Sequence, residues 1–181
     1  TFTAMSTGAI GSFDRVFLDV QDSDPNILYA MMESATSGFI TWIGKSSDGG
    51  ANWTDLSIAT DSDNNPFGDY QGSMAYWGHI GVDPNDGNTV YVGGGLHIYK
   101  STDSGSSWTQ MSNWFTNNGT LPYVHADQHN HAFIDSDNIL FTNDGGVFLT
   151  TDGGTTFTDK NNNMVTTQFY STAIHPSSDY V

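Results

Sequence analysis

Residues 46–53 have the sequence Ser-Ser-Asp-Gly-Gly-Ala-Asn-Trp, and this stretch returns twice along the chain. It reappears at 101–108 as Ser-Thr-Asp-Ser-Gly-Ser-Ser-Trp and at 150–157 as Thr-Thr-Asp-Gly-Gly-Thr-Thr-Phe. The shared pattern is Ser/Thr-x-Asp-x-Gly-x-x-aromatic, with its aspartates 55 and then 49 residues apart. A period of this length is typical of repeat architectures, so we expect a chain of similar units.

Three short runs rich in β-branched and aromatic residues precede each copy of this motif. Before the second copy they are 79–84, 89–93 and 96–100. A fourth short run follows the motif, and four strands in about 50 residues make one blade of a β-propeller. The sequence therefore predicts an all-β chain, a β-propeller of four-stranded antiparallel blades.

The repeat also predicts where each blade lies. The expected bounds within the partial propeller of residues 1–181 are 15–57, 77–111 and 125–160, with a fourth blade starting at 168–181. About three to four blades are fewer than most propellers need to close a ring, and a single blade cannot bury both faces. We therefore expect an excised piece whose partners are the remaining blades of the same protein or further chains.

Composition excludes several classes of function. The chain has 20 acidic and four basic residues, a formal net charge of −16, and no cysteine. Nucleic-acid binding needs clustered Lys and Arg, so this class is disfavoured. Disulfides and thiolate metal sites are excluded. No apolar run approaches the roughly 20 residues of a membrane helix, so membrane insertion is not expected.

The repeated motif has a physical logic of its own. The glycine two positions after its aspartate can take positive φ in a tight hairpin, the aspartate can accept hydrogen bonds from turn amides, and the aromatic residue can fill the space under the turn. We expect these residues to be structural. They are Ser46, Asp48, Gly50, Trp53, Ser101, Asp103, Gly105, Trp108, Thr150, Asp152, Gly154 and Phe157.

The three copies resemble the Asp-box motif, or BNR repeat, of sialidase, sortilin and xyloglucanase propellers. Together with the stretches 125–129 and 143–147, the chain from Arg15 to Val181 looks like the secreted Asp-box propellers of Bacteroidota-type bacteria. The resemblance implies a secreted or cell-surface protein whose hairpins lie opposite the binding face. A sialidase is disfavoured, because that family holds its substrate with three arginines and this chain has Arg15 alone.

Two long connections between blades are expected on the binding face. The first, residues 57–76, contains Tyr70, and the second, residues 111–124, contains Trp114 and Tyr123. Connections of this length are usually functional or disordered. Aromatic rings beside carboxylates suit a carbohydrate cleft, while the alternative is that these rings cap the adjacent blades.

The densest cluster of titratable residues is His125, Asp127, His129 and His131. On a strand these alternate positions would share one face. His125, Asp127 and His129 could then bind a metal such as Zn²⁺, or the cluster could serve acid–base chemistry. A hydrogen-bonded lining of a watery channel is the third interpretation.

Neighbouring inner strands add candidates to this cluster. Counting in register places His131 at the blade position of His79, and Arg15 and Trp77 at that of His129. We expect all of them to lie near the ligand. Alternating oxygen side chains at 61–65 resemble the start of a calcium loop, although a plain turn is the simpler interpretation.

Two functions remain open from the sequence. The first is a non-enzymatic module of a larger protein that binds glycan or protein. The second is a glycoside hydrolase related to the xyloglucanases, which needs two carboxylates across a cleft. Asp69 and Asp127 are the candidate pair within this chain, and the partner of either could lie on other blades.

Overall fold

The computed structural model describes residues 12–69, 72, 76–115 and 120–164. These residues form twelve strands and no helix. The strands are β1 (Phe13–Val20), β2 (Leu28–Ser34), β3 (Ile40–Ser46), β4 (Thr54–Asp55), β5 (His79–Val82), β6 (Val90–Gly93), β7 (Ile98–Ser101), β8 (Thr109–Gln110), β9 (Gln128–Phe133), β10 (Ile139–Asn143), β11 (Gly146–Thr150) and β12 (Thr158–Asp159). The prediction of an all-β chain is confirmed.

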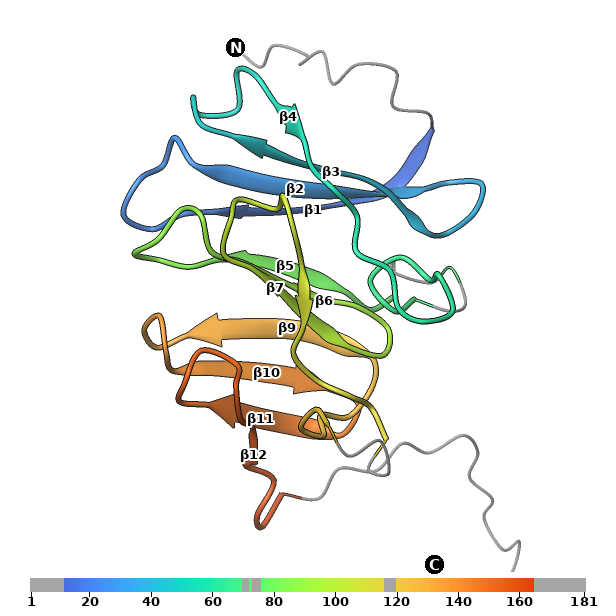
Figure 1. Ribbon diagram of the computed structural model, residues 1–181, viewed down its shortest axis with the longest axis vertical. Coiled ribbons are helices and arrows are strands. Elements are labelled where there is room, and N and C mark those ends of the chain that lie inside the picture. The colour runs from blue at the N-terminus through green and yellow to red at the C-terminus, as the bar shows by residue number, and fades with distance from the viewer. Residues whose placement is uncertain (1–11, 70–71, 73–75, 116–119, 165–181) are drawn as a thin grey trace, which may run out of the picture.

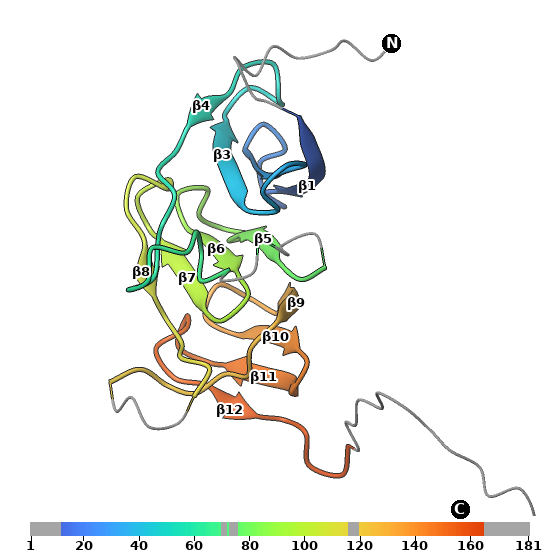
Figure 2. The same cartoon turned by 90° about the vertical axis from the view of Figure 1, so that its right-hand side faces the viewer.

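The strands form three separate four-stranded sheets, each with its strands in sequence order and every neighbouring pair antiparallel. We call β1–β4 the first sheet, β5–β8 the second and β9–β12 the third. Figure 1 shows them stacked along the long axis, and Figure 2 shows the stack from the side. The first strands β1, β5 and β9 lie next to one another along the stack.

Two apolar cores hold the stack together. Alternate residues of a strand face opposite sides of its sheet, so each inner face contributes one row of side chains. The core between the first and second sheets includes Tyr29, Met31, Ile80 and Val82, all buried. The core between the second and third sheets includes Tyr91, Ile98, Ile139, Phe141 and Phe148.

The repeated motif forms the hairpin between the third and fourth strands of each sheet. In the second sheet, Asp103 accepts hydrogen bonds from the Ser107 amide at 2.8 Å and from the Ser107 and Ser101 hydroxyls at 2.6 and 2.7 Å. The Ser101 hydroxyl in turn accepts from the Gly105 amide at 2.8 Å. Gly105 has φ +80°, a value that favours glycine. The same arrangement recurs around Asp48 and Asp152.

The register of the third sheet differs by one residue from the sequence-based expectation. His131 pairs with Phe141, as Ile80 pairs with Val92 in the second sheet. His131 therefore occupies the position of Ile80, and the expectation that it matches His79 is wrong.

The turn that follows these strands explains the shift. In the second sheet the Asp83 amide bonds to the Thr89 carbonyl, whereas in the third sheet the Ile134 amide bonds to the Asn138 carbonyl. The third sheet therefore carries one more residue before the turn aspartate than the second. A shift of one residue sends a side chain to the opposite face of its sheet. His131 consequently faces the second sheet, while His79 faces the third, and the two meet.

Candidate functional site

The long connections between sheets lie along one side of the stack, on the right in Figure 1, and the hairpins of the repeated motif lie along the opposite side. The second connection is anchored to the first of these sides by backbone hydrogen bonds. The Asp127 and Gln128 amides donate to the carbonyls of Gly95 and Gly94, and the Gly78 amide donates to the Gln128 carbonyl at 2.6 Å. These bonds fix the chain just before β9, where the candidate residues are concentrated.

A cavity of about 730 Å³ opens between the two long connections. We call it the aromatic pocket. Three of its rings, those of Trp114, Phe115 and Tyr123, are exposed. Its lining consists of Asp63, Asn65, Leu96, Trp114, Phe115, Tyr123, His125, Ala126 and Asp127. The aromatic wall therefore faces polar side chains across an open cleft.

The aromatic wall is held by a short backbone bridge. The Asn113 amide donates to the Pro122 carbonyl at 2.9 Å, and the Val124 amide donates to the Asn113 carbonyl at 3.0 Å. Asn113 and Val124 are buried, so they fix both ends of the loop. Trp114 and Tyr123 directly follow and precede these two anchors, which places their rings in the same wall.

The opposite wall is set by a turn around Asp61. Its Oδ1 accepts from the Asp63 and Asn65 amides, each at 2.9 Å. The Asn65 side chain also donates to Oδ2 at 2.9 Å. Because amide donors hold both oxygens of Asp61, this segment forms an Asx-rich turn. It presents Asp63 and Asn65 to the pocket.

The strand pattern expected for His125, Asp127, His129 and His131 is wrong for its first two members. Strand β9 begins at Gln128, and Asp127 has φ +62°, which breaks the extended alternation. His125 and Asp127 therefore turn into the aromatic pocket, away from the row of His129 and His131. Among the described residues no group of three His, Asp or Glu is arranged to hold a metal ion, so the structure does not assemble the expected metal centre.

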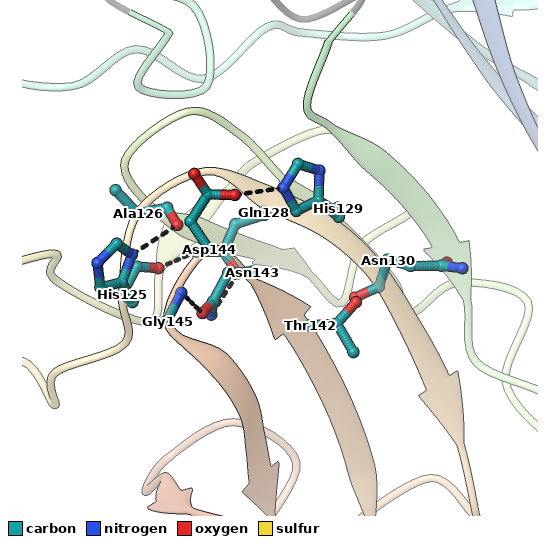
Figure 3. Close-up of polar contacts among 9 residues, drawn as sticks. All are labelled: His125, Ala126, Gln128, His129, Asn130, Thr142, Asn143, Asp144 and Gly145. Carbon is teal, nitrogen blue, oxygen red and sulfur yellow. Dashed lines mark hydrogen bonds and ion pairs between the residues drawn. The ribbon is translucent and has the colours of Figure 1, made fainter. Parts of the chain in front are cut away.

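His129 pairs with Asp144 rather than joining His125 and Asp127 in a metal site. Its Nε2 lies 2.6 Å from Asp144 Oδ1, and Figure 3 shows the two side chains reaching toward each other from β9 and from the turn between β10 and β11. His125 Nδ1 lies 3.1 Å from the Ala126 carbonyl, and the Gln128 amide group donates to the His125 carbonyl.

The carboxyl group of Asp127 lies in an unusual environment. Burial raises its pKa above the ordinary value of 3.8, and the negative charges of Asp144 and Asp69 raise it further. His125 and His129 act in the opposite direction. A carboxyl group with a raised pKa, beside a second carboxylate and lining an open cavity, is a common feature of catalytic and binding sites.

A smaller cavity of about 320 Å³ lies between the inner strands. It contains three of the expected ligand residues, Arg15, His79 and His129. The rest of its lining is Phe17, Leu18, Gly78, Ile80 and Asn130. The expected site residues are thus divided, with His125, Asp127, Trp114 and Tyr123 in the aromatic pocket and these three in the smaller cavity.

Of the other candidates, those within the described residues line neither cavity. Asp69 is fully buried. Trp77 is half-buried against the core between the first and second sheets. Tyr70 lies outside the described residues. His131 faces His79, with their Nδ1 atoms 2.9 Å apart.

Sequence reasoning missed the role of Asp144 beside His129, and the contributions of Leu96 and Ala126 to the pocket. A signal for Asp144 existed. It precedes Gly145 and Gly146 in the tight turn between the second and third strands, and such turns lie along the same side of the stack as the long connections.

Comparisons with known proteins identify the fold. No family model matches the chain, and no curated protein matches it. A GH74 enzyme from Niastella koreensis has a similar structure, with a TM-score of 0.56, 24% identity, and coverage of 78% of this chain and 22% of that chain. The GH74 xyloglucanase from Xanthomonas campestris gives a TM-score of 0.53 at 15% identity, covering 78% of this chain and 22% of the enzyme.

A third similar structure is YCF48 from Cyanidioschyzon merolae, with a TM-score of 0.50, 16% identity, and coverage of 82% of this chain and 38% of that one. The chain therefore spans less than half the length of these proteins. All three comparisons agree with stacked propeller blades, so the three sheets are blades of a β-propeller. Within the described residues no helix is long and apolar enough to cross a membrane.

Proposed function

We propose that this chain is part of a secreted or cell-surface β-propeller protein and binds a glycan in the aromatic pocket. The observation that carries this proposal is the wall of three exposed rings facing polar side chains. A sugar ring has an apolar face that can stack on Trp114, Phe115 or Tyr123. Ligand pockets commonly combine such apolar walls with a few placed polar groups.

The polar wall suits sugar hydroxyls. Carboxylates accept hydrogen bonds from hydroxyl groups, and an amide side chain both donates and accepts. Asp63, Asn65 and Asp127 supply these groups in the lining of the pocket. The turn around Asp61 holds the first two in place, so they need little ordering when a ligand binds.

The test is calorimetric titration of the purified chain with a panel of plant and bacterial oligosaccharides. We expect binding of at least one glycan, and a loss of about tenfold or more in affinity for Trp114→Ala. Phe13→Ala is the matched control, because Phe13 is also an exposed aromatic residue but lies on β1, outside the pocket. Equal weakening by both variants, or no binding of any glycan, would count against the proposal.

A second candidate function, glycoside hydrolysis, is favoured by the negative charge of Asp144 near the Asp127 carboxyl group. Glycosidases need one carboxyl group that stays protonated and one that stays ionised. Burial raises the pKa of Asp127, which suits a general acid, and the nearby Asp144, 2.6 Å from His129 Nε2, is the candidate for the second carboxyl group. This pair replaces Asp69 and Asp127 as the proposed catalytic pair, because Asp69 is fully buried.

Release of reducing ends from xyloglucan and other β-glucans tests this candidate. We expect Asp127→Asn and Asp144→Asn each to abolish release while glycan binding persists. If the chain binds a glycan without cleaving it, the binding proposal stands and the hydrolase candidate fails.

A further inference from the structure

The boundary between the first and second sheets is held by a pair of polar side chains. Tyr29 on β2 and Lys45 on β3 occupy directly paired positions. The Tyr29 hydroxyl and the Lys45 Nζ each donate to the Gly87 carbonyl of the second sheet at 2.8 Å. Lys45 also donates to the Ser104 hydroxyl at 2.8 Å. Two donors thus converge on one carbonyl across the boundary.

The boundary between the second and third sheets has a matching pair of donors, although its acceptor lies in the hairpin between the third and fourth strands rather than in the turn between the first and second. Tyr91 on β6 and Lys100 on β7 are directly paired. The Tyr91 hydroxyl and the Lys100 Nζ donate to the Gly153 carbonyl at 3.1 and 2.9 Å. Each lysine also lies over its tyrosine ring, with Nζ 5.3 Å from the Tyr29 centroid and 5.1 Å from that of Tyr91. We call this arrangement the Tyr–Lys pair.

The third sheet lacks the Tyr–Lys pair. Its equivalent positions are Leu140 on β10 and Leu149 on β11, which pair with each other. The assignment follows from register, because Leu149 precedes Thr150 as Lys100 precedes Ser101. Leucine has no hydrogen-bond donor in its side chain, so the outer face of the third sheet presents an apolar pair instead.

The outer face of the first sheet exposes a row of apolar side chains. Leu18 and Val20 on β1 are 56% and 39% exposed. The residues that occupy their positions in the second sheet, Ile80 and Val82, are 5% and 2% exposed, because the first sheet covers them. The row on β1 therefore has the composition of a sheet-to-sheet boundary, and no sheet among the described residues covers it.

An acceptor for the Tyr–Lys pair also exists on the first sheet. Gly49 holds the hairpin position of Gly153. A β-carbon placed on Gly153 would lie 3.1 Å from Lys100 Nζ, so the preceding sheet fills that space. A β-carbon on Gly49 would meet Asn26 Oδ1 of its own sheet at 3.7 Å, and no atom of another sheet in the described part of the chain lies as near.

We propose that the outer face of the first sheet, comprising Val16, Leu18, Val20 and the Gly49 hairpin, docks a further four-stranded sheet that carries a Tyr–Lys pair. The partner is a blade from outside the described chain rather than a second copy. Both Tyr–Lys pairs within the described residues are already engaged, and the outer face of the third sheet presents Leu140 and Leu149 at the corresponding positions. Continuity with the two observed boundaries supports this choice.

The experiment supplies the missing pair. The donor is the triple variant L18D/L140Y/L149K, in which the two last substitutions create a Tyr–Lys pair on the third sheet and the first blocks the donor's own docking face. The receiver is the wild-type chain. We expect a one-to-one complex in sedimentation equilibrium, at least tenfold tighter than wild-type self-association. The matched control donor is L18D/L140F/L149M, which keeps apolar side chains and should not bind more tightly than wild type.

Three outcomes would overturn the proposal. One is equal affinity for the donor and the control donor. Another is strong self-association of the wild-type chain that Leu18→Asp abolishes, since a second copy would then be the occupant. The third is a folded donor, shown by circular dichroism and thermal unfolding, that does not associate. If the donor fails to fold, Lys100→Met in the wild-type chain should speed hydrogen exchange in β9–β11, and unchanged exchange would equally overturn the role of the pair.

Discussion

His79 and His131 meet across the boundary between the second and third sheets, with their Nδ1 atoms 2.9 Å apart. One Nδ1 must carry a proton and the other must accept it. His79 is buried, and aromatic rings lie beside the pair. The ring centroid of Phe141 is 5.9 Å from that of His79, and the ring centroid of Phe133 is 5.1 Å from that of His131. The contact exists because the third sheet is shifted by one residue, which turns His131 toward the second sheet.

The histidine pair should make the chain sensitive to acid. Burial lowers the pKa of His131 from 6.5 to about 4 and also lowers that of His79, with His131 and His129 contributing. In the unfolded chain both histidines bind protons near pH 6.5. Their contribution to the free energy of unfolding is therefore fully present above pH 6.5 and is lost as the pH falls from 6.5 toward 4. We expect a loss of roughly 1–3 kcal/mol in this window, measured by urea unfolding at several pH values.

The double variant His79→Phe/His131→Leu is the control for this prediction. Phe17 and Leu18 occupy the two positions in the first sheet, so both side chains suit the geometry. The variant should keep its stability between pH 6.5 and 4.5. An equal loss in the variant and the wild type would assign acid sensitivity to other groups.

Gly81 should be intolerant of a side chain for a reason that lies in the neighbouring sheet. A β-carbon at this position would lie 1.9 Å from His131 Nε2. We expect Gly81→Ala to lower the free energy of unfolding by roughly 1–3 kcal/mol, since it overpacks a tight boundary. In the His131→Ala background the same substitution should cost little. A double-mutant cycle with no coupling between the two sites would contradict this packing.

The Asp103→Ala variant should unfold at a lower temperature. It removes the acceptor for the Ser107 amide and for the hydroxyls of Ser101 and Ser107. These bonds lower the pKa of Asp103 to about 2, so its contribution is complete above pH 3.8 and fades as the pH falls toward 2. Asp22→Ala is the control, because no hydrogen bond from the described residues to the Asp22 side chain is present. Equal midpoint temperatures of thermal unfolding for both variants would argue against a structural role for the motif.

The sheets were predictable because their signals are local. The motif around Asp103 contains its own hydrogen-bond partners within seven residues, and the preceding runs carry the alternation that a two-faced strand requires. Any copy of such a motif can be recognised without knowledge of what lies beside it. This explains why the strand content and the hairpins followed from the sequence.

The site was less predictable because it depends on departures from regular backbone and register. The positive φ of Asp127 turns the side chains of His125 and Asp127 away from the row on β9, and an aspartate in the sequence does not by itself predict a positive φ. The extra residue before the turn at Asp135 reverses the direction of His131. Asp144 reaches His129 from a turn 15 residues later, a relation that only the folded sheet creates. Each of these depends on tertiary geometry, which a count of residues along one strand does not contain.

Asp127 provides the sharpest test of the site, because its two most informative substitutions act differently on the backbone. Asparagine tolerates positive φ well, whereas alanine at φ +62° costs about 1–2 kcal/mol. We therefore expect Asp127→Asn to fold with wild-type stability and Asp127→Ala to be measurably less stable in urea unfolding. Both variants should lose general-acid chemistry, because neither side chain carries an ionisable proton.

Comparing the two variants separates the effect of backbone strain at position 127 from the effect of losing the side chain's hydrogen bonds to a ligand. Glycan affinity should fall less for Asp127→Asn than for Asp127→Ala, since the amide still offers hydrogen bonds to a sugar hydroxyl at the pocket wall. Asp127→Gly should recover the stability that alanine loses, because glycine takes positive φ without strain, but it should not recover the affinity. If glycine restored both, the role of Asp127 would be to shape the connection before β9. Loss of affinity in a stable Asp127→Gly variant would place the carboxyl group in contact with the ligand.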